Sequence, residues 1–187
     1  MSDATTAYVS LGANLGDRLA TLREAVRCLG DLGKVTGVSS LYETDPVGYE
    51  EQPAFLNAVV ALHTALDASS LVRALLSIEA SLGRTRSFRN APRTLDLDLL
   101  LLGDAVVATD DVHVPHPRLQ ERAFVLAPLV ELAPYARHPV LSRTVRQLYD
   151  ALDSHEGVVR VAGPAWVIPP AGGAERAADR SGNPASG

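Results

Sequence analysis

The chain has 187 residues, the length of one ordinary domain, and 47% of them are apolar, which is enough for a hydrophobic core. Its 17 Lys and Arg against 22 Asp and Glu give a net charge of −5. That balance argues against general binding to nucleic acid or anionic membranes, since both need a basic surface. A single cysteine, a polar start unlike a signal peptide and a central apolar run limited to 99–102 favour a cytoplasmic protein without a membrane span. One polar-surfaced domain suggests a monomer.

Apolar periodicity predicts alternating strands and helices over the first part of the chain. In chain order these are a strand over 7–11, a helix capped by Asp17 and ending near 30–33, strands over 34–43 and 55–63, a helix over 67–83 and a strand over 93–102, with loops over 45–53 and 84–92. The order βαββαβ predicts an α+β, ferredoxin-like sandwich in which helices pack on one face of an antiparallel sheet. This fold serves enzymes, regulators and RNA binders, so it does not decide the function.

The rest of the chain is predicted to add short helices around 124–132 and 145–152. From about residue 163 the composition shifts to Pro, Gly, Ala and Ser, and such a segment buries too little apolar surface to offset its ordering entropy. We therefore expect residues 1–162 to form the domain and 163–187 a flexible tail. Trp166 with 167–168 is a candidate anchor for the start of that tail.

Two carboxylates, Asp96 and Asp98, lie two positions apart on the last predicted strand. Alternate residues of a strand project to the same side, so these carboxylates lie together while their leucine neighbours pack the other way. Paired hard oxygen ligands suit Mg²⁺, and two such ions can clamp a polyphosphate. The alternative is a pair of solvated acids on an exposed strand, but the strand continues into 99–102 and is therefore expected to be central.

Basic residues gather immediately before these acids. Arg84, Arg86, Arg89 and Arg93 fall in a stretch without any Asp or Glu. Phosphoryl transfer needs such a pairing, with metal ions on bridging oxygens and guanidinium groups on developing negative charge. A solvated basic loop is the alternative.

A third group, His116 with Arg118 and Arg122, follows later in the chain. A histidine beside two arginines suits a phosphate oxygen, although a lone histidine is more often structural.

Phe55 and Asn57 form a fourth group on one strand face, where a flat ring could stack on the phenylalanine and hydrogen-bond to the amide. A core phenylalanine beside an asparagine at a strand irregularity is the alternative. The turn at 12–17 matches no phosphate-binding fingerprint and is interpreted as a structural connection.

Several segments together resemble the 6-hydroxymethyl-7,8-dihydropterin pyrophosphokinase family. The signature PRTLDLDLLLLG is highly specific, and LGANLGDR, SSLYETDPVG, QPAFLNAVV, IEASLGRTR and VPHPRLQERAFVLAPL match in the right order, covering about residues 8–134. Departures include Phe55 where tyrosine is common and Asp45 where proline is frequent.

The resemblance implies a Mg²⁺-dependent enzyme of folate synthesis that transfers pyrophosphate from ATP to 6-hydroxymethyl-7,8-dihydropterin and releases AMP. It implies a loop at 84–92 that closes over the substrates. The implied site residues are Asp96 and Asp98 for two Mg²⁺ ions; Arg84 and Arg93 for catalysis and ATP; Glu79, His116 and Arg122 for ATP; and Thr44, Pro46, Val47, Phe55, Asn57 and Phe124 for the pterin.

Two other functions fit parts of the sequence. Another metal-dependent phosphoryl or nucleotidyl transferase would keep the acids and arginines but would not need Phe55, Asn57 and Phe124. A non-catalytic binding domain would not need paired acids beside an arginine loop.

Overall fold

The computed structural model describes residues 3–46, 51–83 and 94–168. Its main sheet has six strands: β1 (Thr5–Ala13), β2 (Lys34–Val38), β3 (Leu41–Thr44), β4 (Phe55–Thr64), β5 (Asp96–Leu102) and β8 (Val158–Ala162). The strand order is β5-β1-β4-β3-β8, with β2 also pairing with β4, and every pairing is antiparallel. The βαββαβ order and the ferredoxin-like fold are confirmed.

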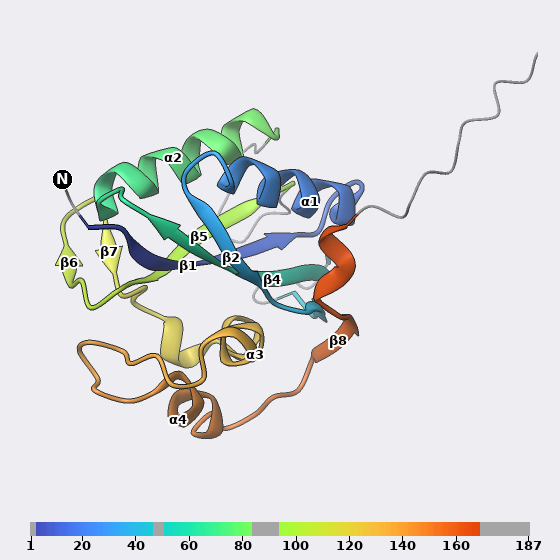
Figure 1. Ribbon diagram of the computed structural model, residues 1–187. Coiled ribbons are helices and arrows are strands. Elements are labelled where there is room, and N and C mark those ends of the chain that lie inside the picture. Colours follow the sequence, from blue (N-terminus) through green and yellow to red (C-terminus); the bar gives the residue numbers. More distant parts are fainter. Residues whose placement is uncertain (1–2, 47–50, 84–93, 169–187) are drawn as a thin grey trace, which may run out of the picture.

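Helices cover both faces of this sheet rather than the single face that we expected. The helices α1 (Arg18–Leu29) and α2 (Ala68–Ser81) lie on one face, and α3 (Ala123–Leu132) and α4 (Val145–Asp150) lie on the other (Figure 1). Asp17 caps α1 as predicted, and Asp67 caps α2 by accepting a 2.7 Å hydrogen bond from the Ser70 amide. In the described ranges, no helix is both long and apolar enough to cross a membrane.

Two hydrophobic cores result from these two layers, and strand alternation divides the residues between them. Val9 and Leu11 of β1 and Leu97 of β5 pack into the core beneath α1 and α2. Val59 of β4 packs into the core against α3 and α4. Ser10, Gly12, Phe55, Asn57, Asp96 and Asp98 occupy the alternate positions, so they belong to the α3 face.

The predicted strand over 34–43 is two strands, because the chain breaks at Ser39 and Ser40. Both serines are buried, and the Ser39 hydroxyl accepts a 2.9 Å hydrogen bond from the amide of Val59. The Ser39 carbonyl accepts another of 2.9 Å from the indole of Trp166. The Ser39 amide still donates a 2.9 Å hydrogen bond to the Val59 carbonyl, but the Ser40 amide donates at 2.6 Å to the Glu131 side chain instead of to a neighbouring strand.

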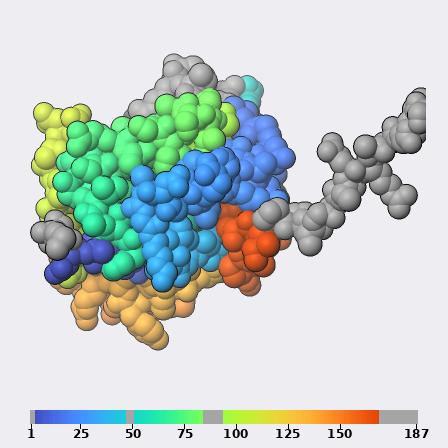
Figure 2. Space-filling model, turned by 45° about the horizontal axis from the view of Figure 1, so that its top comes forward, coloured from blue at the N-terminus to red at the C-terminus, as the bar shows by residue number. Residues whose placement is uncertain are grey.

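Short elements that sequence reasoning did not predict complete the fold: β6 (Val107–Ala108), β7 (His113–Val114), the 3₁₀ helices η1 (Leu119–Glu121) and η2 (Pro164–Val167), and the strand β8. Trp166 of η2 is 5% exposed, and its carbonyl accepts a 2.6 Å hydrogen bond from Arg23 of α1. Figure 2 shows η2 seated beside α1. Ordered structure thus continues past residue 162, through the anchor expected at Trp166.

Candidate active site

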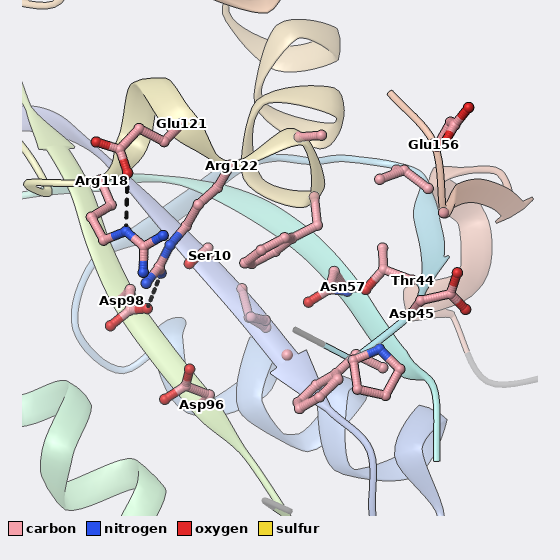
Figure 3. Close-up of a pocket in the computed structure, with 18 of the residues that line it drawn as sticks. Ser10, Thr44, Asp45, Asn57, Asp96, Asp98, Arg118, Glu121, Arg122 and Glu156 are labelled. Carbon is pink, nitrogen blue, oxygen red and sulfur yellow. Dashed lines mark hydrogen bonds and ion pairs between the residues drawn. The ribbon is translucent and has the colours of Figure 1, made fainter. Parts of the chain in front are cut away.

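A cavity of about 440 Å³ opens on the α3 face of the sheet, within the range of small-molecule sites. Residues from β1, β3, β4, β5, η1, α3 and β8 reach it (Figure 3). Its lining consists of Ser10, Leu11, Gly12, Thr44, Asp45, Pro46, Gln52, Phe55, Asn57, Asp96, Asp98, Arg118, Glu121, Arg122, Ala123, Phe124, Glu156, Gly157 and Val158. It therefore joins two residue groups, the acids of β5 and the Phe55–Asn57 pair, that lie far apart in the sequence.

The carboxylates of Asp96 and Asp98 lie at one end of the cavity. Both project from the same face of β5, as strand alternation predicted, and both border the cavity (Figure 3). The register sets Asp98 opposite Ser10 and Asp96 opposite Gly12. Because Ser10 and Gly12 are small, they leave space beside the two carboxylates. Asp96 and Asp98 therefore face the cavity.

Two basic side chains approach Asp98 from outside the sheet. The guanidinium of Arg122 lies 3.9 Å from the Asp98 carboxylate, and Nε2 of His116 lies 4.0 Å from it. His116 is held beside β5 because its backbone amide donates a 2.9 Å hydrogen bond to the carbonyl of Leu100. The structure thus brings the predicted ATP contacts His116 and Arg122 to the predicted metal ligands.

The His116 ring presents an N–H toward the acids. Its Nδ1 accepts a 3.1 Å hydrogen bond from the backbone amide of Arg118, which leaves the proton of the neutral ring on Nε2. Burial, assisted by the positive charge of Arg122, lowers the pKa of His116 to about 4. At neutral pH the ring is therefore an uncharged donor, suited to a phosphate oxygen.

The other end of the cavity carries the predicted ring-binding residues. Asn57 is buried and donates a 2.6 Å hydrogen bond to the Thr44 hydroxyl, which fixes the orientation of its amide. A Cβ at Gly12 would lie 3.0 Å from the Asn57 amide oxygen, a contact tight enough to push on that amide, and in ordinary contact with the Phe55 ring at 3.8 Å. Phe55, Pro46 and Phe124 border the same cavity.

The first residues of α3 connect the two ends. Arg122 precedes the helix and Phe124 lies in its first turn, with the guanidinium 5.7 Å from the centre of the phenyl ring. This distance is within the range of a cation–π contact. One helix terminus therefore carries a cation for the acidic end and an aromatic ring for the other end.

Glu79 is placed differently from the other predicted ATP contacts. It is 2% exposed, does not line the cavity, and accepts a 2.7 Å hydrogen bond from the backbone amide of Leu97. Leu97 lies between Asp96 and Asp98, so Glu79 anchors the strand that carries both acids. Its direct contact with ATP stays a prediction.

The structure does not test the predicted loop over 84–92 or three of the predicted site residues, because they lie outside the described residues. These three are Val47, Arg84 and Arg93.

Arg118, which the sequence groups with His116 and Arg122 as suited to a phosphate oxygen, also lines the cavity. Arg118 adds a third basic group near the acids, and Glu121 holds its guanidinium at 3.1 Å (Figure 3). Sequence reasoning gave no role to Glu156, Gly157 and Val158, because only the pairing of β8 with β3, in which Val158 lies opposite Thr44, brings them to the cavity.

The acids fit a metal ion that binds few protein ligands. In the described part of the chain, no three His, Cys, Asp or Glu side chains cluster as a metal site. Two carboxylates beside an open cavity would leave most coordination positions to water and to a phosphorylated substrate. Mg²⁺ is commonly bound in this way, whereas zinc and calcium sites use more protein ligands.

A cavity that joins acidic and basic side chains at one end to aromatic side chains at the other is typical of a small-molecule transferase that handles phosphate groups. Residues 8–134 match the family described as 7,8-dihydro-6-hydroxymethylpterin-pyrophosphokinase (HPPK), and the chain belongs to this family.

Curated relatives carry related names. The 2-amino-4-hydroxy-6-hydroxymethyldihydropteridine pyrophosphokinase of Bacillus subtilis (strain 168) is 52% identical over 128 residues, which is 67% of this chain and 77% of that protein. The protein of the same name from Aquifex aeolicus is 34% identical over 142 residues, or 76% of this chain and 89% of that one. The folic acid synthesis protein fol1 of Schizosaccharomyces pombe is 39% identical over 150 residues, but this chain spans only 20% of its length.

A solved structure agrees with the fold. Wild-type HPPK-DHPS of Plasmodium falciparum aligns with a TM-score of 0.63 and 17% identity, covering 80% of this chain and 45% of that one. At this identity the likeness supports the ferredoxin-like fold and carries no argument about the site.

Proposed function

We propose that this chain transfers the pyrophosphate group of ATP to the hydroxymethyl group of 6-hydroxymethyl-7,8-dihydropterin in folate synthesis. The pterin hydroxyl oxygen attacks the β-phosphorus of ATP, and the bond from that phosphorus to the oxygen bridging to the α-phosphate breaks. AMP leaves with that oxygen, the hydroxyl proton is released, and the pterin diphosphate is formed.

The single observation that carries this proposal is the division of one cavity into two chemically different ends. Carboxylates, arginines and a histidine N–H gather at one end, while aromatic side chains and an oriented amide gather at the other. A polyphosphate matches the first end and a flat nitrogen heterocycle matches the second. Binding both in one cavity brings the acceptor hydroxyl to the phosphate.

Asp96 and Asp98 would hold the two Mg²⁺ ions of this reaction. When bound, the ions neutralise phosphate charge and polarise the phosphorus that is attacked. Arg122 and the His116 Nε2–H, which lie beside Asp98, would bind phosphate oxygens. Arg84 and Arg93, assigned from their positions in the sequence, would stabilise the charge that develops during transfer.

At the pterin end, the oriented Asn57 amide and the backbone at Thr44, Pro46 and Val47 would hydrogen-bond to the heterocycle. Phe55 and Phe124 would stack on its two faces. The Thr44–Asn57 hydrogen bond and the nearby rings favour this acceptor over that of another phosphoryl transferase, for which these residues would have no purpose. The cytoplasmic location and monomeric state expected from the sequence stay predictions.

The direct test is incubation of the protein with ATP, Mg²⁺ and 6-hydroxymethyl-7,8-dihydropterin, followed by chromatography of nucleotides and pterins. Equal amounts of AMP and pterin diphosphate are expected, with none when the pterin is omitted or when EDTA removes the metal. ADP with a pterin monophosphate would indicate a simple kinase. Binding of both ligands without turnover would favour a non-catalytic domain.

A further inference from the structure

The strand-to-helix turn between β1 and α1, interpreted above as merely structural, contacts the rim of the cavity. Asn14 in this turn is 2% exposed. Its side-chain amide donates a 2.7 Å hydrogen bond to the Gln52 side chain and a 3.1 Å one to the Pro53 carbonyl. Gln52 lines the cavity. A buried side chain from a distant part of the sequence therefore contacts the segment that leads into β4.

Arg18, at the start of α1, binds the next residue of the same segment. Its guanidinium donates a 2.7 Å hydrogen bond to the Ala54 carbonyl and pairs with Glu43 at 3.0 Å. Glu43 belongs to β3 and immediately precedes Thr44. Arg18 therefore connects the segment before β4 to the strand that carries another residue of the cavity wall.

The backbone carbonyls of residues 53 and 54 have no partner strand in the described part of the chain and are satisfied by side-chain donors from other elements. This segment precedes the first paired residue of β4, Phe55, and Pro53 has no backbone N–H to give to a neighbouring strand. The carbonyls of Pro53 and Ala54 accept hydrogen bonds from Asn14 and Arg18 instead. These two carbonyls lie directly before Phe55. Hydrogen bonds to them therefore restrain the backbone position of Phe55 and, with it, the position of its ring.

We propose that Asn14 and Arg18 are positioning residues for the pterin end of the cavity. They hold residues 52–54 so that Gln52 and Phe55 keep their places in the wall. This inference rests on the proposed function, because it assigns the effect to the pterin and not to ATP. The acids and Arg122 at the ATP end lie on β5 and beside α3, elements that neither residue contacts through these hydrogen bonds.

The first variants that test the proposal are Asn14→Ala, Arg18→Ala, Arg18→Lys and the control Val60→Ala. Loss of the Asn14 hydrogen bonds should raise the pterin KM and Kd about tenfold and change the ATP KM less than threefold. Arg18→Ala should act in the same direction, while Arg18→Lys keeps one donor and should restore most of the affinity.

The control separates positioning from general destabilisation. Val60 is buried in the core on the opposite face of β4, so Val60→Ala should lower Tm without changing the pterin KM. The Gln52→Ala variant completes a double-mutant cycle. Adding Asn14→Ala to it should cost less pterin affinity than Asn14→Ala costs alone, because one shared contact is already lost.

Pterin binding measured by calorimetry, beside AMP formation, distinguishes the two proposals. If Asn14→Ala weakens pterin binding while the wild type forms no AMP, the positioning role stands and the pyrophosphokinase proposal fails. If the wild type forms AMP and Asn14→Ala keeps its pterin affinity, or loses pterin and ATP affinity equally, the positioning role is overturned. A wild type that does not bind pterin overturns both.

Discussion

The side-chain amide of Asn57 donates a 2.6 Å hydrogen bond to the hydroxyl of Thr44 on the neighbouring strand. The register sets Thr44 opposite Phe55 and Tyr42 opposite Asn57, so Thr44 and Asn57 are diagonal neighbours on one sheet face. Both are buried at the wall of the cavity. An amide fixed in this way would present one constant hydrogen-bonding edge to the proposed pterin substrate.

Replacing Thr44 with valine keeps the shape of the side chain and removes the acceptor. The Asn57 amide then loses a bond worth about 0.5–1.5 kcal/mol and its fixed orientation. We expect the pterin KM to rise about three- to tenfold, with an unchanged ATP KM, in steady-state assays of AMP formation.

Thr64→Val is the matched control for this change. Thr64 is also buried, and its hydroxyl donates a 2.7 Å hydrogen bond to the Leu32 carbonyl away from the cavity. It should lower Tm while both KM values stay at wild-type levels. A rise in the pterin KM of Thr64→Val equal to that of Thr44→Val would contradict the orienting role.

Phe124 offers a second test of the pterin end. Aromatic stacking adds about 0.5–1.5 kcal/mol beyond buried area, so Phe124→Ala should weaken pterin binding about tenfold or more in calorimetric titrations. Phe124→Tyr keeps the ring and should bind nearly as the wild type does. Because the Phe124 ring also contacts Arg122, ATP affinity should fall slightly. Equal losses for both ligands would indicate disruption of the whole site.

The ferredoxin-like core was predictable because its strands and helices carry periodic apolar residues. The break at Ser39 and Ser40 was not, because it depends on Val59 and on Trp166, which is 127 positions away from Ser39. The strand β8 was missed for a related reason. It is a largely exposed edge strand, so its sequence lacks the apolar alternation that marks a half-buried strand.

The candidate site was predictable where a local rule applied. Strand alternation alone placed Asp96 and Asp98 on one face. The approach of His116 to Asp98 depends on tertiary structure and could not be predicted from the sequence. The backbone amide of His116 must first hydrogen-bond to the Leu100 carbonyl. The contribution of Asn14 was missed because its partners are the Gln52 side chain and a backbone carbonyl, for which the sequence offers no pattern.

Gly157, immediately before β8, supports the cavity wall from outside the segment that matches the family. Its φ is +71°, and an added Cβ would lie 2.9 Å from the carboxylate of Asp45. Gly157→Ala should therefore cost about 1–2 kcal/mol of stability through the left-handed backbone and should also displace Asp45 beside Pro46. We expect a lower Tm and a pterin KM raised about threefold or more.

Gly103→Ala separates these two effects. Gly103 also has a positive φ, +50°, and its added Cβ would approach the Thr5 hydroxyl at 2.7 Å, but it does not border the cavity. It should lower Tm to a similar extent and leave the pterin KM unchanged. The support role of Gly157 would be wrong if the two variants had the same kinetics.

The acids of β5 give the sharpest test of the chemistry. Asp96→Asn and Asp98→Asn keep the side-chain volume and remove one negative charge each. The Arg122–Asp98 pair is partly exposed, with 25% and 35% of the side chains accessible, so its loss should cost at most about 1 kcal/mol. Removing one of two neighbouring carboxylates also relieves repulsion. Both variants should therefore stay folded, with Tm close to that of the wild type without Mg²⁺.

Turnover should fall sharply although stability hardly changes, because each carboxylate would hold a metal ion against the phosphates. Loss of a metal ligand should lower kcat on the order of 10³-fold or more at saturating Mg²⁺ and ATP. The rise in Tm that Mg²⁺ produces with a non-hydrolysable ATP analogue should shrink in both variants, since only bound ligand stabilises the native state. Asp104→Asn, at an exposed turn after β5, is the control and should keep the full rate. A near-wild-type rate for Asp96→Asn or Asp98→Asn would exclude that carboxylate as a required ligand and leave the phosphate end to the basic side chains alone.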